Sequence, residues 1–164
     1  MMLPDFRDAP LDGKSVLLRA DLNVPFEGTE IADRGRVVRC AATVSQLLAR
    51  GARVVIIAHL DRPRGVVNPV LSIAPVASAL ATELNRNVRF VPDSVGATAE
   101  RWTRSLPEGG VALLENLRFH GEEEENDRAF AMMLSVHGDI YVNDAPSSSI
   151  RRHASIHAIA ALMV

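Results

Sequence analysis

The sequence predicts an α/β fold, an open three-layer sandwich with a mostly parallel, Rossmann-like sheet. Short apolar runs alternate with helical patterns along the chain, and this alternation is typical of strands joined by right-handed helical crossovers. Hydrophobic residues make up 48% of the 164 residues, which is enough for a substantial core. No repeat or Pro/Gly-rich linker divides the chain, so one domain is expected over residues 1–164.

Five segments are expected to be strands because they are almost continuously apolar and several are rich in β-branched residues. Such runs are typical of parallel strands covered on both faces. In chain order they are Ser15–Ala20, Arg53–Ala58, Val88–Val91, Val111–Glu115 and Asp139–Asn143.

Four helices are expected between these strands. Val37, Ala41, Val44 and Leu48 share one helical stripe. The remaining three helices are Ile73–Leu84 with Ser72 as its N-cap, Ala97–Leu106, and Asp127–Val136 capped by Asn126 or Asp127.

Composition excludes several classes of protein. The net charge of −2 and an aromatic content of 4% argue against a general nucleic-acid binder. No stretch reaches the roughly 18 apolar residues of a membrane helix, and residues 1–10 lack a signal-peptide pattern, so the cytoplasm is the expected location. The single cysteine, Cys40, has no partner for a disulfide and is expected to be a small buried hydrophobe.

Polar and cationic side chains follow four of the five predicted strands. These segments are Asp21–Pro25, His59–Pro63, Asn116–His120, and Asp144 with Arg151–His153. Because the carboxyl ends of parallel strands meet at one edge of a sheet, the segments are expected to form an anion-binding cleft. Lys14 is the only lysine, and the other 17 of the 18 basic residues are arginine, whose planar fork suits phosphate and carboxylate. Codon bias alone would explain that excess, so position must carry the argument.

These loops resemble those of the phosphoglycerate kinase family, in order and in spacing, from about Leu11 to Ser155. The matching segments are Arg19–Pro25 (RADLNVP), His59–Pro63 (HLDRP), Leu114–His120 (LENLRFH) with the acidic run after it, Tyr141–Ala145 (YVNDA), and Arg151 with His153–Ser155 (HAS).

The resemblance implies a role for each site residue. Asp21 and Asn23 would hold the carboxylate and hydroxyl end of 3-phosphoglycerate. Arg36 would bind substrate and, as the catalytic residue, stabilise the phosphoryl group in transfer. The basic patch that grips the 3-phosphate would consist of His59, Arg62, Arg118 and Arg151. The complete enzyme would use Mg-ATP/ADP and transfer a phosphoryl group reversibly between 1,3-bisphosphoglycerate and ADP, giving 3-phosphoglycerate and ATP.

Each role has a plainer structural alternative. Asp21 and Asn23 could brace the turn that follows them. His59 could be a strand-end histidine bonded to backbone, and Arg36 could be a surface residue of the first helical turn, with Arg34 as a rival for its role. The run Glu122–Glu125 is expected to be solvated. The histidines show no metal-ligand spacing, so no metal site is expected.

Two departures from the family pattern weaken the expectation of substrate binding. Asp61 stands where the family has glycine, which puts a carboxylate beside the phosphate patch and removes the residue best suited to positive φ. The loop Pro146–Ile150 also differs from the family pattern. The alternative function is therefore a non-catalytic phospho-ligand-binding or interaction module with an eroded site, and a pseudogene-like remnant is a third hypothesis.

The resemblance covers only the N-terminal, substrate-binding domain. No G-x-G-x-x-G segment is present, so no nucleotide site is expected here, and the C-terminal nucleotide-binding domain would be the absent partner. The chain alone is therefore predicted to lack kinase activity. Its partners would be 3-phosphoglycerate or 1,3-bisphosphoglycerate, with no nucleic acid and no membrane. The apolar tail Ile156–Val164 is expected to expose a sticky patch.

Overall fold

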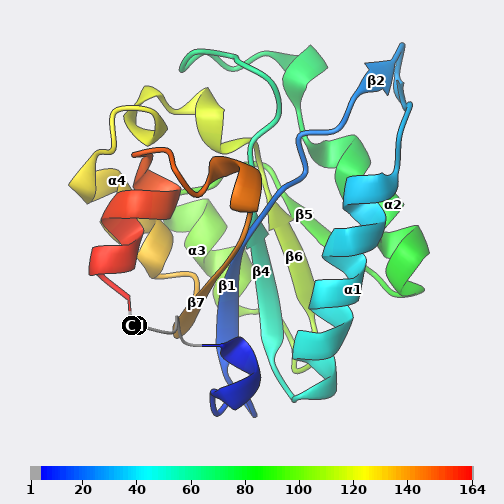
Figure 1. Ribbon diagram of the computed structural model, residues 1–164, viewed down its shortest axis with the longest axis vertical. Coiled ribbons are helices and arrows are strands. Elements are labelled where there is room, and N and C mark those ends of the chain that lie inside the picture. Colours follow the sequence, from blue (N-terminus) through cyan, green and yellow to red (C-terminus); the bar gives the residue numbers. More distant parts are fainter. Residues whose placement is uncertain (1–4, 164) are drawn as a thin grey trace.

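A five-stranded parallel sheet forms the middle layer of the protein, whose computed structural model describes residues 5–163 (Figure 1). The strand order is β5-β6-β4-β1-β7, and every neighbouring pair is parallel. The predicted Rossmann-like three-layer fold is confirmed. The strands are β1 (Ser15–Ala20), β4 (Arg53–Ile57), β5 (Arg89–Val91), β6 (Val111–Leu114) and β7 (Ile140–Asp144).

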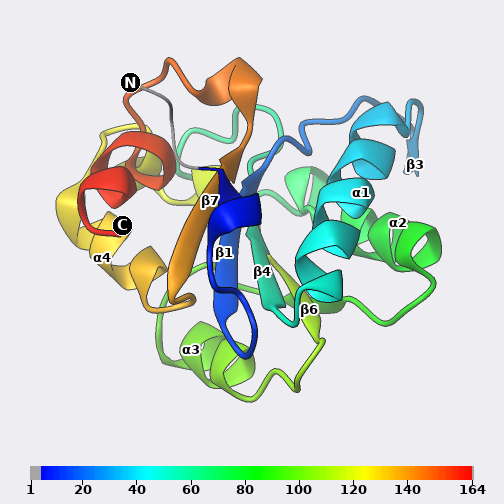
Figure 2. The same cartoon turned by 60° about the horizontal axis from the view of Figure 1, so that its bottom comes forward.

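Helices cover both faces of this sheet (Figures 1 and 2). In β4, Val54 and Ile56 face one apolar core, whereas Val55 and Ile57 face the other. This alternation explains why the strand is apolar at every position. The first core contains α1 (Gly35–Ala49) and α2 (Ala74–Leu84), and the second contains α3 (Ala97–Arg104) and α4 (Arg128–Ser135).

Shorter helical turns lie mostly in the loops at the carboxyl edge of the sheet and at the end of the chain. The 3-10 turns are Phe6–Asp8, Pro69–Leu71, Leu117–Phe119, Gly121–Glu123, Pro146–Ser148 and Ile159–Ala161, and Ala154–Ala158 forms one π-helical turn.

One of the two predicted helix caps is confirmed. The Asp127 carboxylate accepts a hydrogen bond from the Phe130 N–H at 2.7 Å, at the start of α4. The prediction for Ser72 holds in part. The Ser72 hydroxyl accepts a hydrogen bond from the N–H of Ala74, the first residue of α2, at 3.2 Å, although the cap position itself falls to Ile73. The carboxylate of Glu115, directly after β6, also bonds to the start of this helix. It accepts hydrogen bonds from the Ile73 N–H at 2.9 Å and from the Ser72 hydroxyl at 2.7 Å.

A small antiparallel ribbon follows β1 and was not predicted. It pairs β2 (Phe26–Glu27) with β3 (Glu30–Ile31) around Gly28, which has a φ of 65°. Strands this short leave no period-2 pattern for the sequence to show. Phe26 and Ile31 pack against the first core, so the ribbon fixes the path of the chain from β1 to α1.

The predicted exposed tail is wrong for the residues that the structure describes. Ile156 and Ile159 are buried, and the segment packs against α4. Ile159 therefore belongs to the second core, with neighbours from the same segment packed against it, whereas Val164 lies outside the described residues. Within residues 5–163 no helix is both long and apolar enough to cross a membrane.

Cys40 is buried in α1, as predicted, with 3% of its surface exposed. Burial in this apolar environment raises the pKa of its thiol to about 12. The thiol therefore stays protonated and behaves as a small hydrophobe.

Candidate anion-binding site

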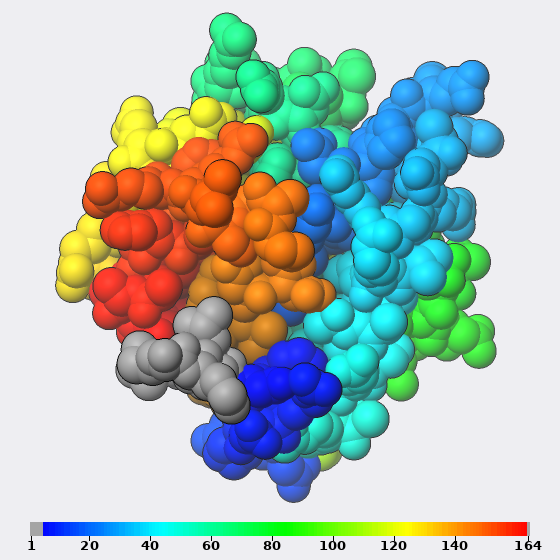
Figure 3. All heavy atoms as spheres, in the orientation of Figure 1, coloured from blue at the N-terminus to red at the C-terminus, as the bar shows by residue number. Residues whose placement is uncertain are grey.

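The predicted site residues gather at the carboxyl edge of the sheet. The loops after β1, β4 and β7 all lie at this end (Figure 1). In the surface view, the segments around residues 20–30, 60–70 and 140–150 meet there (Figure 3). The prediction that the chain would bring these loops together is confirmed by the parallel order of the strands.

Asp21, Asn23 and Arg36 form the first of two clusters. The Arg36 Nε lies 3.5 Å from an Asp21 carboxylate oxygen, and an Arg36 terminal N–H donates to the Asn23 carbonyl. The Ser147 hydroxyl donates to the same Asp21 oxygen at 2.9 Å. Asp21 is thus held by a residue of α1 and by one of the turn after β7, and the guanidinium of Arg36 is fixed against the turn after β1.

Asp61 joins this cluster to the next one through its backbone. Its N–H donates to the Asn23 side-chain oxygen at 2.9 Å, and its carbonyl accepts from the Arg118 guanidinium at 3.0 Å. The backbone φ of Asp61 is 55°, so it takes the left-handed conformation that glycine adopts most readily. Its carboxylate is exposed and lies within 4.0 Å of no basic nitrogen in the described chain.

Arg118 is the centre of the second cluster, which also contains His59, Arg62 and Arg151. Only 4% of its surface is exposed. Burial is the main cause that lowers the pKa of its guanidinium, Glu124 opposes the shift, and Arg151 and Arg62 lower the pKa further. Arg62 and Arg151 therefore act electrostatically on Arg118, and His59 is in turn affected by the charges of Arg118 and Arg151.

The Arg118 Nε–H is a buried donor without a hydrogen-bond acceptor among the described residues. The nearest carboxylate oxygen, from Glu124, is 3.8 Å away, too far for a hydrogen bond. Arg62 and Arg151 are exposed beside it, and no carboxylate oxygen in the described chain comes within 4.0 Å of either. Three guanidinium groups with one buried orphan donor fit a multivalent oxyanion.

His59 belongs to this cluster but carries no positive charge of its own. Burial, together with the charges of Arg19, Arg118 and Arg151, lowers the pKa of its imidazole to about 2. The expectation of a cationic histidine in the patch therefore has to be refined. A neutral His59 can contribute one N–H donor to a bound anion.

Two hollows flank Arg36 at this edge. The larger, about 590 Å³, is lined by Asn23, Asp61 and Leu71 among others, and the smaller, about 170 Å³, by Asp21 and Asp144 among others. Arg36 lines both. A small anionic ligand in the larger hollow would therefore meet Arg36 and Asn23 together.

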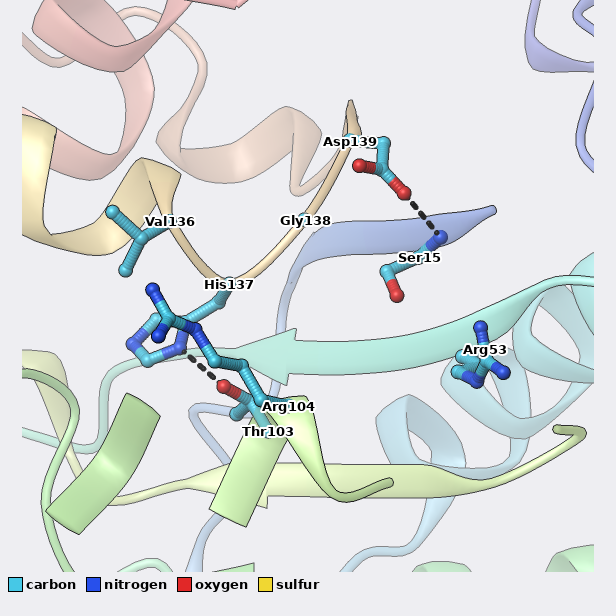
Figure 4. Close-up of a pocket in the computed structure, with 8 residues that line it drawn as sticks. All are labelled: Ser15, Arg53, Thr103, Arg104, Val136, His137, Gly138 and Asp139. Atoms are coloured by element: carbon cyan, nitrogen blue, oxygen red, sulfur yellow. Dashed lines mark hydrogen bonds between the residues drawn. The ribbon is translucent and has the colours of Figure 1, made fainter. Parts of the chain in front are cut away.

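A further hollow of about 310 Å³ lies at the opposite, amino edge of the sheet (Figure 4). His137 forms part of its wall but already uses both ring nitrogens. The Nε2–H donates to the Ser94 carbonyl at 2.8 Å, and Nδ1 bonds to the Thr103 hydroxyl at 2.9 Å. The Asp139 carboxylate is likewise occupied, by the Ser15 N–H at 3.0 Å. These contacts stabilise the fold. Arg53 and Arg104 also line the hollow, and the Arg53 Nε–H is, like that of Arg118, a buried donor without an acceptor among the described residues.

A buried network beneath the site escaped the sequence-based predictions. Glu123 is fully buried, so the expectation of a solvated acidic run is wrong at this position. Its carboxylate accepts hydrogen bonds from the N–H and the hydroxyl of Ser155, and that hydroxyl in turn accepts from Arg19. The sequence did contain one sign of this network. Arg19 is the only charged residue of β1, and a charge in a buried strand requires a buried partner.

Among residues 5–163, no three His, Cys, Asp or Glu side chains lie close enough together to hold a metal ion. Two carboxylates of the site are engaged within the fold. Asp21 bonds to Arg36 and Ser147, and Asp144 accepts a hydrogen bond from Thr43 at 2.7 Å.

Comparison with known proteins gives one consistent family. A family model described as phosphoglycerate kinase matches residues 6–164. A phosphoglycerate kinase of Caulobacter vibrioides is 48% identical over 155 residues, covering 94% of this chain and 39% of that protein. Another, from Methylorubrum extorquens, is 46% identical over 165 residues, covering 98% of this chain and 41% of that protein.

Solved structures of the same family share the fold. The phosphoglycerate kinase from Coxiella burnetii superposes with a TM-score of 0.85 at 34% identity, and the one from Pyrococcus horikoshii OT3 with a TM-score of 0.86 at 30% identity. The match covers 96% of this chain in both cases, and 39% and 40% of those chains. The chain thus spans about two fifths of the length of the relatives that it matches.

Proposed function

The chain belongs to the phosphoglycerate kinase family, and from this premise we propose that residues 1–164 form the family's N-terminal domain, which binds 3-phosphoglycerate. One observation carries the proposal. Two clusters of complementary chemistry lie at one edge of the sheet and are joined through the backbone of Asp61. A ligand with a phosphate at one end and a carboxylate at the other needs such a pair of sites.

The basic cluster suits the phosphate end of the ligand. The orphan N–H of Arg118 would donate to one phosphate oxygen, and the exposed guanidiniums of Arg62 and Arg151 would neutralise the remaining charge. His59 would add a neutral N–H donor. Because Arg118 is buried, its contact with an anion is screened little by water and contributes more than an exposed pair would.

The other cluster suits the carboxylate and hydroxyl end. Arg36 would pair with the ligand carboxylate, and Asp21 would accept a hydrogen bond from the ligand hydroxyl, with Asn23 as a further polar partner. Arg36 is oriented for this by its contacts with Asp21 and the Asn23 carbonyl. In the complete enzyme we assign it the catalytic role of neutralising charge on the phosphoryl group in transfer.

The reaction proposed for the complete enzyme is reversible phosphoryl transfer between 1,3-bisphosphoglycerate and ADP, a step of glycolysis that takes place in the cytoplasm. Mg-ADP or Mg-ATP would supply the phosphoryl acceptor or donor. We assign the nucleotide to a second domain and propose that the present chain alone does not turn over. A coupled assay with Mg-ATP and 3-phosphoglycerate should give the blank rate, and turnover above the blank would contradict this.

Isothermal titration calorimetry with 3-phosphoglycerate tests the binding proposal. Arg118→Ala should lower the affinity by roughly 30- to 1,000-fold, since loss of a desolvated charge contact costs about 2–4 kcal/mol. Arg62→Ala, at an exposed position, should cost less. Arg101→Ala is the matched control, because Arg101 is an exposed arginine of α3 and is not part of the site. Equal effects of Arg118→Ala and Arg101→Ala would refute the proposal.

A non-catalytic binding or interaction module is the second candidate. The carboxylate of Asp61 beside the basic cluster and the side chain of Ile150, which is 91% exposed in the loop before Arg151, favour it. Absence of any 3-phosphoglycerate binding at millimolar ligand would support the module over the substrate domain.

A further inference from the structure

Arg19 is fully buried at the carboxyl end of β1. It is two residues from Leu17 and therefore points to the same face of the sheet, toward the second core. A guanidinium in such a place is stable only where its donors are matched by acceptors and its charge is compensated. The partners of Arg19 therefore indicate why a cation is kept there.

Each nitrogen of the Arg19 guanidinium has a partner. The Nε–H donates to the Ser155 hydroxyl at 2.9 Å, one terminal nitrogen donates to the Ala20 carbonyl at 2.6 Å, and the other lies 2.7 Å from Nδ1 of His59. The guanidinium is a rigid plane, so its hydrogen bonds to Ser155 and Ala20 determine where the third nitrogen lies. That nitrogen faces the imidazole of His59, a residue of the site.

The compensating charge comes from Glu123, through Ser155. The Ser155 hydroxyl donates to one Glu123 oxygen at 2.5 Å, and the Ser155 N–H donates to the other at 2.7 Å. The Tyr141 hydroxyl donates to the Ser155 carbonyl at 2.7 Å. Arg19, Ser155 and Glu123 are all fully buried, so the contact to His59 is backed by a rigid and charge-balanced set of hydrogen bonds.

This arrangement decides which nitrogen of His59 carries the proton. An arginine has only donors, so the Nδ1 that faces Arg19 must be an unprotonated acceptor. The proton of the neutral ring then sits on Nε2, which makes no hydrogen bond to any described residue. The other charged or titratable groups near the ring are Arg118, Arg151 and His153, and their electrostatic effects all oppose protonation of His59.

We propose that Arg19, held by Ser155 and Glu123, is a positioning residue that keeps His59 as the Nε2–H tautomer, so that this N–H can donate to the oxyanion at the basic cluster. The inference rests on the proposed function for the identity of that oxyanion, the phosphate of 3-phosphoglycerate. The assignment of the tautomer itself is independent of the proposed function. The other tautomer would present a lone pair to the phosphate and repel it.

The experiment compares the parent chain with variants in which residue 19 either keeps or loses its hydrogen-bond donor to Nδ1 of His59. The double substitution Arg19→Met with Glu123→Gln removes both charges together and leaves no unpaired charge in the core. Arg19→Lys keeps a cationic donor. Arg101→Met is the control at an exposed position of α3.

Imidazole ¹⁵N chemical shifts, measured without ligand between pH 5 and pH 8, report the tautomer directly. A His59→Gln spectrum assigns the His59 signals among those of the five histidines. The parent chain, Arg19→Lys and Arg101→Met should show a protonated Nε2 and a bare Nδ1. The double variant should show a mixture of tautomers. A protonated Nδ1 in the parent chain, or an unchanged tautomer in the double variant, would overturn the proposal.

Calorimetry with 3-phosphoglycerate adds the functional readout. The double variant should bind about twofold more weakly than the parent chain, because only the Nε2–H fraction of a tautomer mixture can donate to the phosphate. Arg19→Lys should recover most of that loss. If the parent chain does not bind 3-phosphoglycerate, the proposed function fails, while the ligand-free spectra still decide the tautomer. If the double variant does not fold, Ser155→Ala is the substitute, because it removes only a hydroxyl. An unchanged tautomer together with unchanged binding in Ser155→Ala would contradict the proposal that Ser155 and Glu123 hold Arg19 in place.

Discussion

The two ends of the sheet each hold one buried histidine, His59 at the carboxyl edge and His137 at the amino edge. Their exposed fractions are 6% and 3%, and burial is the main cause that lowers the pKa of both. His137 has both nitrogens bonded within the fold, to Thr103 and to a backbone carbonyl (Figure 4). His59 bonds through one nitrogen to a cation and has no partner in the described chain for the other.

The difference shows that burial alone does not mark a functional histidine. Burial makes both rings neutral, so charge does not distinguish them. The partners do, because an arginine beside Nδ1 can only leave the proton on Nε2. A hollow in the surface is no better a guide, since one lies beside His137 as well as at the carboxyl edge.

The largest effect in this comparison should come from His137→Ala. The substitution leaves the buried Ser94 carbonyl without its partner, removes the contact to the Thr103 hydroxyl and opens a cavity. The free energy of unfolding should fall by about 2–4 kcal/mol. Urea unfolding measures this loss, and affinity for 3-phosphoglycerate should stay within about twofold in the fraction that remains folded. A stability close to that of the parent chain would mean that these contacts contribute little.

A matched pair of substitutions at His59 should affect binding more than stability. Gln places an amide N–H near the position of Nε2, whereas Asn reaches only to the position of Nδ1. His59→Asn should therefore weaken 3-phosphoglycerate binding by about tenfold, and His59→Gln by less. Calorimetry on both variants decides this. If Gln were as damaging as Asn, the donor at Nε2 would not be what matters.

The pH dependence of stability should also reveal both rings. Because their folded-state pKa values lie below the ordinary 6.5, the unfolded chain binds more protons than the folded chain in acid. Their contribution to stability is present above pH 6.5 and is lost as pH falls below it. For His59 the loss is about 1.4 kcal/mol per pH unit between its unfolded-state and folded-state pKa values. For His59 the window extends down to its folded-state pKa of about 2.

Urea unfolding between pH 7 and pH 4.5 measures this slope. His59→Gln should reduce the slope by the contribution of one ring. A slope unchanged by the substitution would show that folding does not lower the pKa of His59.

The smallest effects are expected at Asp61. Asp61→Asn removes the charge but retains a residue that tolerates a φ of 55°. Affinity for 3-phosphoglycerate should rise by about two- to fivefold, since the carboxylate is exposed and its repulsion is screened. Asp61→Gly should give the same gain in affinity and change the free energy of unfolding by less than about 1 kcal/mol. Weaker binding by Asp61→Asn would show that the carboxylate assists the site.

Strands, helices and the edge of the sheet at which the candidate site residues gather were predictable from local patterns. An apolar run such as Val111–Leu114 identifies a buried strand, and parallel order then places every strand end at one edge. The β2–β3 ribbon was not predictable, since two-residue strands have no period. The burial of Glu123 depends on Ser155, 32 residues away, and no local signal in an acidic run announces such a partner.

A ¹H–¹⁵N correlation spectrum of the chain titrated with 3-phosphoglycerate tests directly where the ligand binds. Amide signals at the carboxyl edge should shift, above all those of Asp61 and Arg118, whose backbone and side chain link the two clusters. Those of Ser15, His137 and Asp139, which line the hollow at the amino edge, should not. Amide shifts at the amino edge without shifts at the carboxyl edge would contradict binding of 3-phosphoglycerate at the carboxyl edge. So would the absence of any shift at millimolar ligand.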